Sequence, residues 1–596
     1  MAGRLRPILW TRRTGRRFLS RLSTARKELP MRPWVGAKLL EVFGADLRSL
    51  ATFRIVLALL VLADLASRVT DLIAHYSDQG ILPRAAVTQN PYVLSPYSFS
   101  LNLMNGQPQF QALLFGITAL AALAMAVGYR TRTATFVVWV LVLSIHHRNM
   151  LVNHAGDVLL QLLLFWSLFL PLGAIWSMDR ARQAAPRRLS TRFFSLATAA
   201  LFMQIAFMYW FTVLLKLSGE EWRGGTALYY TFSNDLITKP IGAFLLHFPS
   251  LLTVGTFATV ALEALGPLLL FCPVKTGPVR TAAVLAVMSL HFGIWLTLQV
   301  GTFPWISAFC MVCFLPAWFW DTVVPKVRTA LPGQTNLARR LQPLRDAATH
   351  LAQNHLLPLR ARSFAGMGGV GGSSTLSVTM RGGRPGSDAS SDNASRGQHG
   401  VSQAGEPVVL RSSLATNLIA LFLLFYVLCW NLTTVSSFPM PRAASPLGPF
   451  LGLTQEWVMF APHPPTDNGW WVLPGNLQGG QQVDLMSVVH NDYGLREVSY
   501  EEPRNGPKAV NNEHWHKYLD NLTNMEIYHN NLPEWRDNAR EQRENFGHYL
   551  CQAWNERHTG DERLENLQID YVSEKTLPNR EHSKPENITL LSNYSC

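Results

Sequence analysis

The chain has 596 residues, of which 48% are hydrophobic, and it contains 18 Trp and 31 Phe. Its formal net charge at pH 7 is +13, and such a charge can indicate a nucleic-acid-binding protein. The basic residues instead lie in segments that separate or flank long apolar stretches, without interleaved aromatic residues. This distribution excludes a nucleic-acid partner and favours contact with anionic lipid headgroups.

Long apolar segments recur along the chain, and a helix needs about 20 apolar residues to cross a bilayer. We expect membrane spans near 52–70, 111–128, 134–150, 157–175, 194–217, 248–272, 281–299, 302–320 and 413–433. The prediction is an all-α polytopic membrane bundle of about eight core spans plus a ninth. Arg54, Asp64 and Arg68 interrupt the first span, where the last two can form an ion pair one helical turn apart.

The spans divide the chain into five expected parts. These are a basic leader (1–50), the transmembrane bundle (51–320), a Gly/Ser-rich basic linker (321–412), the ninth span (413–433) and a C-terminal soluble domain (434–596). The linker has too little apolar surface to fold. Strand-like runs such as GWWVLPG, and a helical pattern after Pro533, predict a strand-rich α+β domain with at least one helix.

Basic residues set the expected orientation of the bundle. The loops 129–133, 177–192 and 273–280, the leader and the linker fall on one side of the membrane, which the positive-inside rule makes cytoplasmic. The N-terminus is then cytoplasmic and the C-terminal domain is extracytoplasmic. We expect a multi-pass protein of the bacterial inner membrane without a cleaved signal peptide, because no apolar core closely follows the Arg-rich start.

The cysteines give two expectations. Cys310 and Cys313 have CxxC spacing, but they stand in an apolar helix, where cysteine acts as a small hydrophobic residue. No metal site is predicted. Cys551 and Cys596 both lie in the outer domain and could form one disulfide there.

Polar side chains inside spans indicate a structural or functional role, because a charge at the bilayer centre costs about 2.5–3.5 kcal/mol. In the fifth span, Gln204, Thr212 and Lys216 recur at helical spacing, and Tyr209 borders the same face. A helix that faces a cavity would need such a stripe. Alternatively, Lys216 simply extends to the membrane surface, because the chain becomes polar at Ser218.

Three other spans carry polar residues that could face the same cavity. They are His154, Asp157 and Gln161 in the fourth span, Glu263 in the sixth, and His291 and Gln299 in the seventh. Four spans would then converge on one polar pocket that opens toward the outer side.

Two of these residues also have structural interpretations. His154 could cap a helix start, and Glu263 could pair with Arg54 or Arg68 to hold helices together. For common cofactors, we find no P-loop, no GxGxxG after a strand, no HExxH and no GxSxG motif.

Several segments resemble a known family. They are FRIVLALLVLADLASR, VNHAGDVLLQLLLFWSLFLP, LLKLSGEEWRGGTALYY, LHFGIWLTLQVGTFPW and, in the outer part, EWVMFAPHPPTDNGWWVLPG. Together they resemble bacterial HTTM-domain proteins, named for a horizontally transferred transmembrane domain. That group is related to vitamin K-dependent gamma-carboxylase.

The resemblance implies roles for the polar residues. In the carboxylase, a lysine in the element matching LLKL is the base that deprotonates vitamin K hydroquinone, which implies this role for Lys216. Matching elements imply that His154 and His291 polarise the substrate and that Glu263 is the accompanying acid. With the polar stripes, the expected pocket residues are Gln204, Tyr209, Thr212, Asp157, Trp295 and Gln299.

These observations lead to three functional hypotheses. The first is a membrane enzyme like the carboxylase, a carbon–carbon lyase that uses reduced vitamin K or another quinol with O2 and CO2, acting on a secreted or membrane-bound peptide. The second is a non-catalytic membrane protein whose outer domain binds a partner or a small apolar ligand. The third is a carrier for a small apolar molecule.

Overall fold

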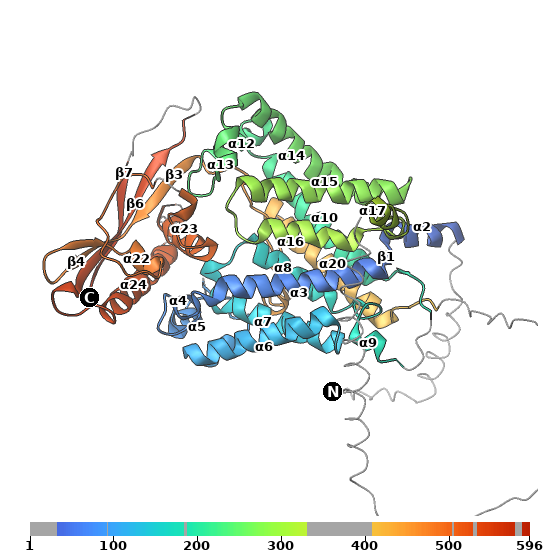
Figure 1. Ribbon diagram of the computed structural model, residues 1–596, viewed down its shortest axis with the longest axis horizontal. Helices are drawn as coiled ribbons and strands as arrows, with labels where there is room; N and C mark the ends of the chain where they lie inside the picture. Colours follow the sequence, from blue (N-terminus) through green and yellow to red (C-terminus); the bar gives the residue numbers. More distant parts are fainter. Residues whose placement is uncertain are drawn as a thin grey trace, which may run out of the picture.

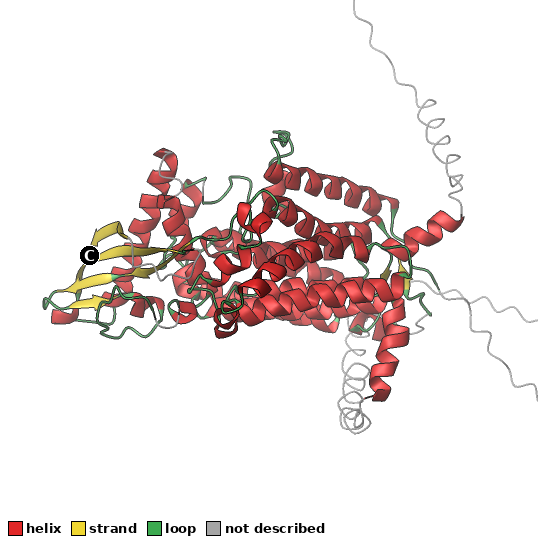
Figure 2. Cartoon of the chain, turned by 90° about the horizontal axis from the view of Figure 1, so that it is seen from above, coloured by secondary structure: helices red, strands yellow, loops and turns green. Residues whose placement is uncertain are grey.

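The computed structural model describes residues 33–91, 93–183, 188–330, 408–503, 506–527, 533–577 and 587–596. A helical bundle forms most of the described chain, and the sheet of the C-terminal domain lies at one end of it (Figures 1 and 2). Residues 1–32 of the expected leader and residues 331–407 of the expected linker lie outside the described residues.

Six helices of the described residues are long and apolar enough to cross a membrane. They are α3 (Leu47–Val69), α6 (Pro108–Val127), α10 (Leu196–Lys216), α14 (Pro249–Leu270), α15 (Thr276–Thr297) and α20 (Leu414–Val435). A seventh span results if the bent pair Phe303–Phe314 and Phe319–Val327, which meet at 88°, is counted as one. The bend follows Leu315, which Pro316 forces out of the helical conformation.

Shorter elements connect the spans. They are α2 (Pro33–Phe43), β1 (Ala45–Asp46), α4 (Leu72–Tyr76), α5 (Arg84–Gln89), α7 (Thr131–Arg148), α8 (Ala155–Ser167), α9 (Met178–Ala181), β2 (Arg192–Phe193), α11 (Glu220–Gly224), α12 (Ala227–Phe232), α13 (Pro240–Leu245), α16 (Phe303–Cys310), α17 (Val324–Ala330) and α21 (Leu447–Leu451).

The structure gives six or seven apolar helices of spanning length rather than the nine expected, and the segments 134–150 and 157–175 do not contain one of them. The second contains α8, whose 13 residues rise only about 20 Å, whereas the apolar core of a bilayer is about 30 Å thick. The first contains α7, which has 18 residues but ends in His146, His147 and Arg148, and these lower its mean hydropathy. Both helices nevertheless pack within the bundle.

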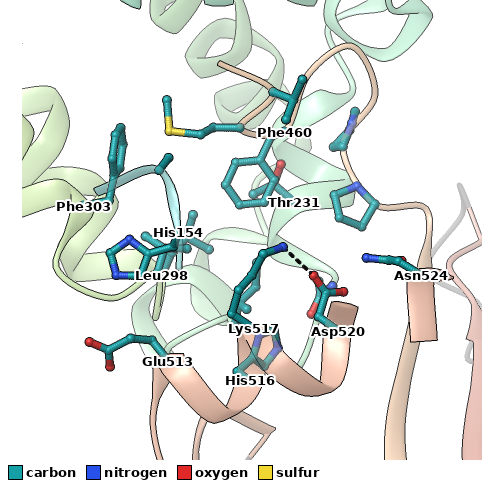
Figure 3. Close-up of a pocket in the computed structure, with 18 of the residues that line it drawn as sticks. His154, Thr231, Leu298, Phe303, Phe460, Glu513, His516, Lys517, Asp520 and Asn524 are labelled. Carbon is teal, nitrogen blue, oxygen red and sulfur yellow. Dashed lines mark hydrogen bonds and ion pairs between the residues drawn. The ribbon is translucent and has the colours of Figure 1, made fainter. Parts of the chain in front are cut away.

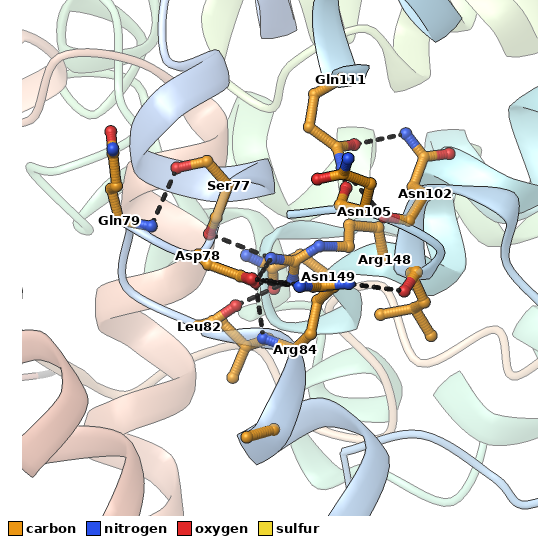
Figure 4. A network of polar contacts seen from close by, with 12 residues as sticks. Ser77, Asp78, Gln79, Leu82, Arg84, Asn102, Asn105, Gln111, Arg148 and Asn149 are labelled. Carbon is orange, nitrogen blue, oxygen red and sulfur yellow. Dashed lines mark hydrogen bonds and ion pairs between the residues drawn. The ribbon is translucent and has the colours of Figure 1, made fainter. Parts of the chain in front are cut away.

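The polar end of α7 holds a long loop in place. Arg148 is buried and donates hydrogen bonds to the carbonyl oxygens of Ser77 and Leu82 at 3.0 and 2.8 Å (Figure 4). In the same network, Arg84 pairs with Asp78 at 2.8 Å. These residues therefore serve to fold the loop between α3 and α6, which explains why α7 is less apolar than a lipid-exposed span.

The C-terminal domain contains an antiparallel five-stranded sheet in the order β3-β6-β4-β5, with β7 on the other edge of β6. Its strands are β3 (Asp467–Val472), β4 (Pro474–Leu477), β5 (Gln482–Asp484), β6 (Leu564–Lys575) and β7 (Asn587–Ser595), and its helices are α22 (Met486–Val489), α23 (Glu513–Ile527) and α24 (Pro533–Asn555). The expectation of a strand-containing domain with helices is confirmed.

Helix α24 packs against β6 and β7 through a buried face that includes Phe546, Leu550 and Trp554. The spacing of these residues, four apart, places them on one side of the helix. Cys551 of α24 and Cys596 after β7 form a disulfide, which joins the helix to the end of the sheet. This is the cysteine pair that the sequence indicated.

Buried hydrogen bonds hold the C-terminal domain against the bundle. Asp71, which follows α3, accepts hydrogen bonds from side chains of that domain: Asn491 at 3.0 Å, Asn512 at 2.6 Å and Trp515 at 3.0 Å. Asp71 and Trp515 are buried, so these bonds are shielded from water. One carboxylate of the bundle therefore anchors the start of α23.

We expect Asp71→Ala to loosen this contact without unfolding the bundle. Each donor left buried without a partner costs about 1–3 kcal/mol. Amide hydrogen exchange measured by mass spectrometry should rise across residues 513–527 and stay near native in α10 and α14. Asp179→Ala, which removes a carboxylate bonded to the start of α7, is the control and should leave 513–527 unchanged. Equal protection of 513–527 in the native and Asp71→Ala proteins would contradict the docking role.

Candidate functional site

A cavity of about 1980 Å³ lies between the bundle and the C-terminal domain. Residues of α8, α10, α14 and α15 line its inner part, and residues of α23 and β7 line its outer part. Residues 454–466, which we call the strap, close one side. Figure 3 shows His154, Leu298 and Phe303 on one side and Lys517 and Asp520 of α23 on another. The volume exceeds the roughly 300–1,000 Å³ of an ordinary ligand pocket.

Lys216 and Glu263 form a buried ion pair in the wall of this cavity. The Nζ atom of Lys216, at the end of α10, lies 2.8 and 2.7 Å from the two carboxylate oxygens of Glu263 in α14. The side chain of Lys216 is only 6% exposed, and the ring of Trp222 lies 4.4 Å from Nζ. The alternative that Lys216 extends to the membrane surface is therefore wrong.

The pairing proposed between Glu263 and an arginine is also wrong. Arg54 donates instead to backbone carbonyl oxygens, including those of Leu172 at 2.9 Å and Trp176 at 2.6 Å. Arg68 binds two other carboxylates, described below.

Tyr209 and His291 form a second polar pair in the cavity wall. The hydroxyl of Tyr209 lies 2.7 Å from Nε2 of His291, and both residues are buried. The Nδ1 atom of His291 is buried and has no hydrogen-bond partner among the described residues. Since buried polar atoms are nearly always hydrogen-bonded, this atom indicates a place for a ligand or water.

His154 caps helix α8, as the structural interpretation proposed, and it also lines the cavity. Its Nδ1 accepts a hydrogen bond from the amide of Gly156 at 3.0 Å. Its own amide donates to Asp157 at 2.9 Å. A neutral imidazole has one lone pair, which Nδ1 uses here, so Nε2 carries the hydrogen. His154 therefore offers an N–H group in the cavity wall.

Behind His154 lies a buried cluster centred on Arg68. Its guanidinium lies 2.9 Å from Asp64, in the predicted i, i+4 pair, and 2.6 Å from Asp157. It also donates to the hydroxyl of Tyr76 at 2.6 Å. All four side chains are buried, so removing any one would leave charge or hydrogen-bonding capacity unsatisfied. The cluster holds Asp157, and hence His154, in a fixed position.

Two groups of these side chains have the residue types of a metal site. They are His154, Asp157 and His514, and Asp64, His146 and Asp157, with the ligand atoms of each group within 4.8 Å of one another. Both groups share Asp157, which already binds the positive charge of Arg68. The first also needs Nε2 of His154, which carries a hydrogen. The geometry therefore favours a hydrogen-bonded network over a metal centre in these groups.

The strap provides the hydrogen-bond partner of one polar residue of α10. Gln204 does not line the cavity; its amide donates to Gln455 of the strap at 2.7 Å. The same Gln455 oxygen accepts a hydrogen bond from Trp457 at 3.1 Å. Trp222 donates to the carbonyl oxygen of Phe460 at 2.8 Å. Part of the polar stripe thus holds the strap, which in turn closes the cavity.

The other expected pocket residues divide between two places. Thr212, Asp157 and Gln299 line the cavity together with Tyr209. Trp295 does not; its ring packs against Trp305, with centroids 4.8 Å apart. All four residues expected to act in catalysis, namely Lys216, His154, His291 and Glu263, line the one cavity.

Sequence reasoning missed the outer wall of the cavity. Glu513, His516, Lys517, Asp520 and Asn524, all of α23, line it (Figure 3). Two features of the sequence indicate an amphipathic helix here. The five residues recur at helical spacing, and the preceding Asn512 is a residue type that caps helices; its side chain accepts hydrogen bonds from the amides of His514 and Trp515.

An ion pair within α23 contributes charged groups to this outer wall. Lys517 lies 2.9 Å from Asp520. Burial acts to raise the pKa of Asp520, but Lys517 and His516 outweigh it and hold that pKa below its usual value. Burial lowers the pKa of His516. The outer wall is therefore charged and polar, whereas the inner part also contains Met208, Leu290 and Ile294.

The inner part of this site lies in a segment that matches a known domain. The sequence model of the HTTM domain matches residues 44–318, so this part of the chain is an HTTM domain. HTTM domains are found in vitamin K-dependent gamma-carboxylase. No match to the chain was found among curated proteins or among solved structures. The strap and α23, which complete the cavity, lie outside the matched residues.

The ion pair of Lys216 and Glu263 should show strong coupling in stability. Lys216→Met leaves a buried carboxylate without a partner, which costs roughly 3–5 kcal/mol, and Glu263→Met does the same to the ammonium. Replacing both by methionine should recover most of the loss, because an apolar pair of similar volume is often neutral. Thermal unfolding of the three variants in detergent measures this. Additive losses in the double variant would contradict a direct pair.

Proposed function

We propose that this HTTM-domain membrane protein binds a lipid-soluble quinol in its cavity and uses the Lys216–Glu263 pair to accept the quinol's proton. The observation that carries the proposal is that this buried pair shares one cavity with His154 and His291. The proposed reaction class is that of vitamin K-dependent gamma-carboxylase, a quinol-dependent carboxylation that also uses O2 and CO2.

The lining of the cavity suits a ring that carries hydroxyl groups. Met208, Leu290 and Ile294 provide apolar surface, and Phe303 provides an aromatic face. The N–H of His154 can donate to an oxygen of the ring, and Nδ1 of His291 is a buried atom in need of a partner. A quinol thus satisfies both the apolar and the polar parts of the wall.

The ion pair determines how a proton can be taken up. Lys216 can act as a base only after its own proton passes to Glu263, which is in direct contact. The pair then acts as one unit, with Nζ nearest the substrate and the carboxylate as the proton store. His154 and His291 would stabilise the oxyanion that forms, since preorganised donors at developing charge supply much of the catalysis in such sites.

The remaining steps follow from the family resemblance. With O2, a quinol of this kind supplies a base strong enough to remove a carbon-bound proton, and CO2 then adds to that carbon. The residues of α23 and the exposed end of the cavity would receive the acceptor, which we propose is a peptide outside the membrane. This matches the proposed orientation, in which the basic loops near Arg132 and Lys275 are cytoplasmic and the C-terminal domain is extracytoplasmic.

The test is quinol-dependent oxygen uptake by the purified full chain in detergent, with reduced vitamin K as the probe. We expect Lys216→Ala to abolish uptake and Glu263→Gln to reduce it strongly, because each disables the proton-accepting pair. The control is Lys239→Ala. Lys239 is also partly buried in the bundle, but its Nζ bonds to the carbonyl oxygen of Trp295, outside the cavity lining, so uptake should be retained.

Equal oxygen uptake by the native and Lys216→Ala proteins would overturn the proposed mechanism. Binding of the oxidised quinone, measured by quenching of tryptophan fluorescence, separates the remaining hypotheses. Saturable binding without oxygen uptake would favour a binding protein or carrier for an apolar molecule. The size and lining of the cavity are compatible with that second function.

A further inference from the structure

One residue of the C-terminal domain packs among polar residues of the HTTM domain. His514, the second residue of α23, is fully buried. It contacts Ser67 near the end of α3, the carbonyl oxygen of Val152, and His154. The rings of His514 and His154 are stacked, with centroids 5.8 Å apart and planes at 13°. His154 lines the cavity and His514 does not, so His514 contacts His154 from outside the cavity lining.

The hydrogen bonds of the two histidines define complementary tautomers. A carbonyl oxygen can only accept, so Nδ1 of His514 donates to Val152 at 3.1 Å and its Nε2 keeps the lone pair, 3.3 Å from the hydroxyl of Ser67. His154 has the opposite arrangement, because its Nδ1 accepts from Gly156. Burial, followed by the nearby Arg68, lowers the pKa of His514 well below its usual value, so its ring is neutral.

The stack supplies a restraint that the cap of α8 does not. The terminal torsion of a histidine ring is broad, so one hydrogen bond at Nδ1 leaves the ring room to turn about its Cβ–Cγ bond. The ring of His514, which lies nearly parallel with its centroid 5.8 Å away, restricts that rotation. Asp157 is held by Arg68 on another side, with His154 Nε2 at 3.8 Å from its carboxylate. His514 thus adds a contact from α23 to the His154 ring.

We propose that His514 is a positioning residue for the cavity, which holds the ring of His154 so that its N–H is presented to the bound substrate. The consequence for the reaction rests on the proposed function; the restraint on the ring does not. The matched HTTM domain alone therefore has an incomplete site, and docking of the C-terminal domain completes it.

The docking contacts support this coupling. Asn512, two residues before His514, donates to Asp71 at 2.6 Å, and Trp515 donates to the same carboxylate at 3.0 Å. Asn521, two turns further along α23, donates to the carbonyl oxygen of Leu151 at 2.6 Å. The turn at 150–152 and the start of α8 are thus tied to α23, so that displacement of α23 would withdraw His514 from His154.

The direct test is deuterium exchange at the C2 position of the His154 ring, followed by mass spectrometry of the full chain in detergent. This exchange reports on the freedom and solvent access of one imidazole. We expect His514→Ala to accelerate the exchange at His154 several-fold. His514→Asn, whose planar amide can still donate to Val152 and lie beside the His154 ring, should stay closer to the native rate.

Asn521→Ala is the matched control, because it removes a contact between the same helix and the same turn without touching His154. It should leave the His154 exchange rate near native. A native rate in His514→Ala would overturn the proposal. Equal acceleration in His514→Ala and Asn521→Ala would also overturn it, since the effect would then be general docking. Size-exclusion profiles identify any variant that fails to fold, and His514→Asn then decides the outcome.

A second measurement uses oxygen uptake with reduced vitamin K. We expect His514→Ala to lower kcat roughly tenfold to a hundredfold with KM little changed, as misplacement of a catalytic group does, and His514→Asn to restore part of it. A loss confined to KM would contradict the positioning role. If the native protein shows no uptake, the proposed function fails, and the exchange rates at His154 still decide the role of His514.

Discussion

Polar groups inside the bundle must find partners within the protein, because the lipid around it offers none. The buried ion pair of Lys216 and Glu263 shows what this constraint produces. Either residue alone would be a costly charge, whereas together they form a stable unit between α10 and α14. Arg68 does the same with Asp64 and Asp157 near the ends of α3 and α8. The ion pair lies in the wall of the cavity, and of the Arg68 cluster Asp157 lines it.

The cavity belongs to both domains rather than to the HTTM domain alone. The strap covers polar residues that would otherwise be unsatisfied, as Gln204 shows through its bond to Gln455. Helix α23 supplies charged residues at the outer wall and inserts His514 behind His154. The inner part combines apolar side chains with buried polar groups, whereas the outer part is charged and polar. The docking of the C-terminal domain is therefore part of the site.

Much of the candidate site could be predicted from sequence, but not its internal pairing. Helical spacing identified Tyr209, Thr212 and Lys216 as one face, and all three line the cavity. The same spacing placed Gln204 in the pocket, where it instead binds the strap, because spacing identifies a face and not the partner of each residue on it. Trp295 was also expected in the pocket, yet it packs against Trp305.

The sequence by itself determined that this is a multi-pass helical membrane protein with a strand-containing C-terminal domain, and it identified the HTTM segment. Hydropathy and residue spacing are local properties, so they can be read along the chain. Only the tertiary structure decided that Glu263 binds Lys216, 47 residues away, rather than an arginine. It alone decided that α8 is too short to span and that His514 lies behind His154. Such contacts join distant segments, and packing between helices, which no local pattern encodes, selects them.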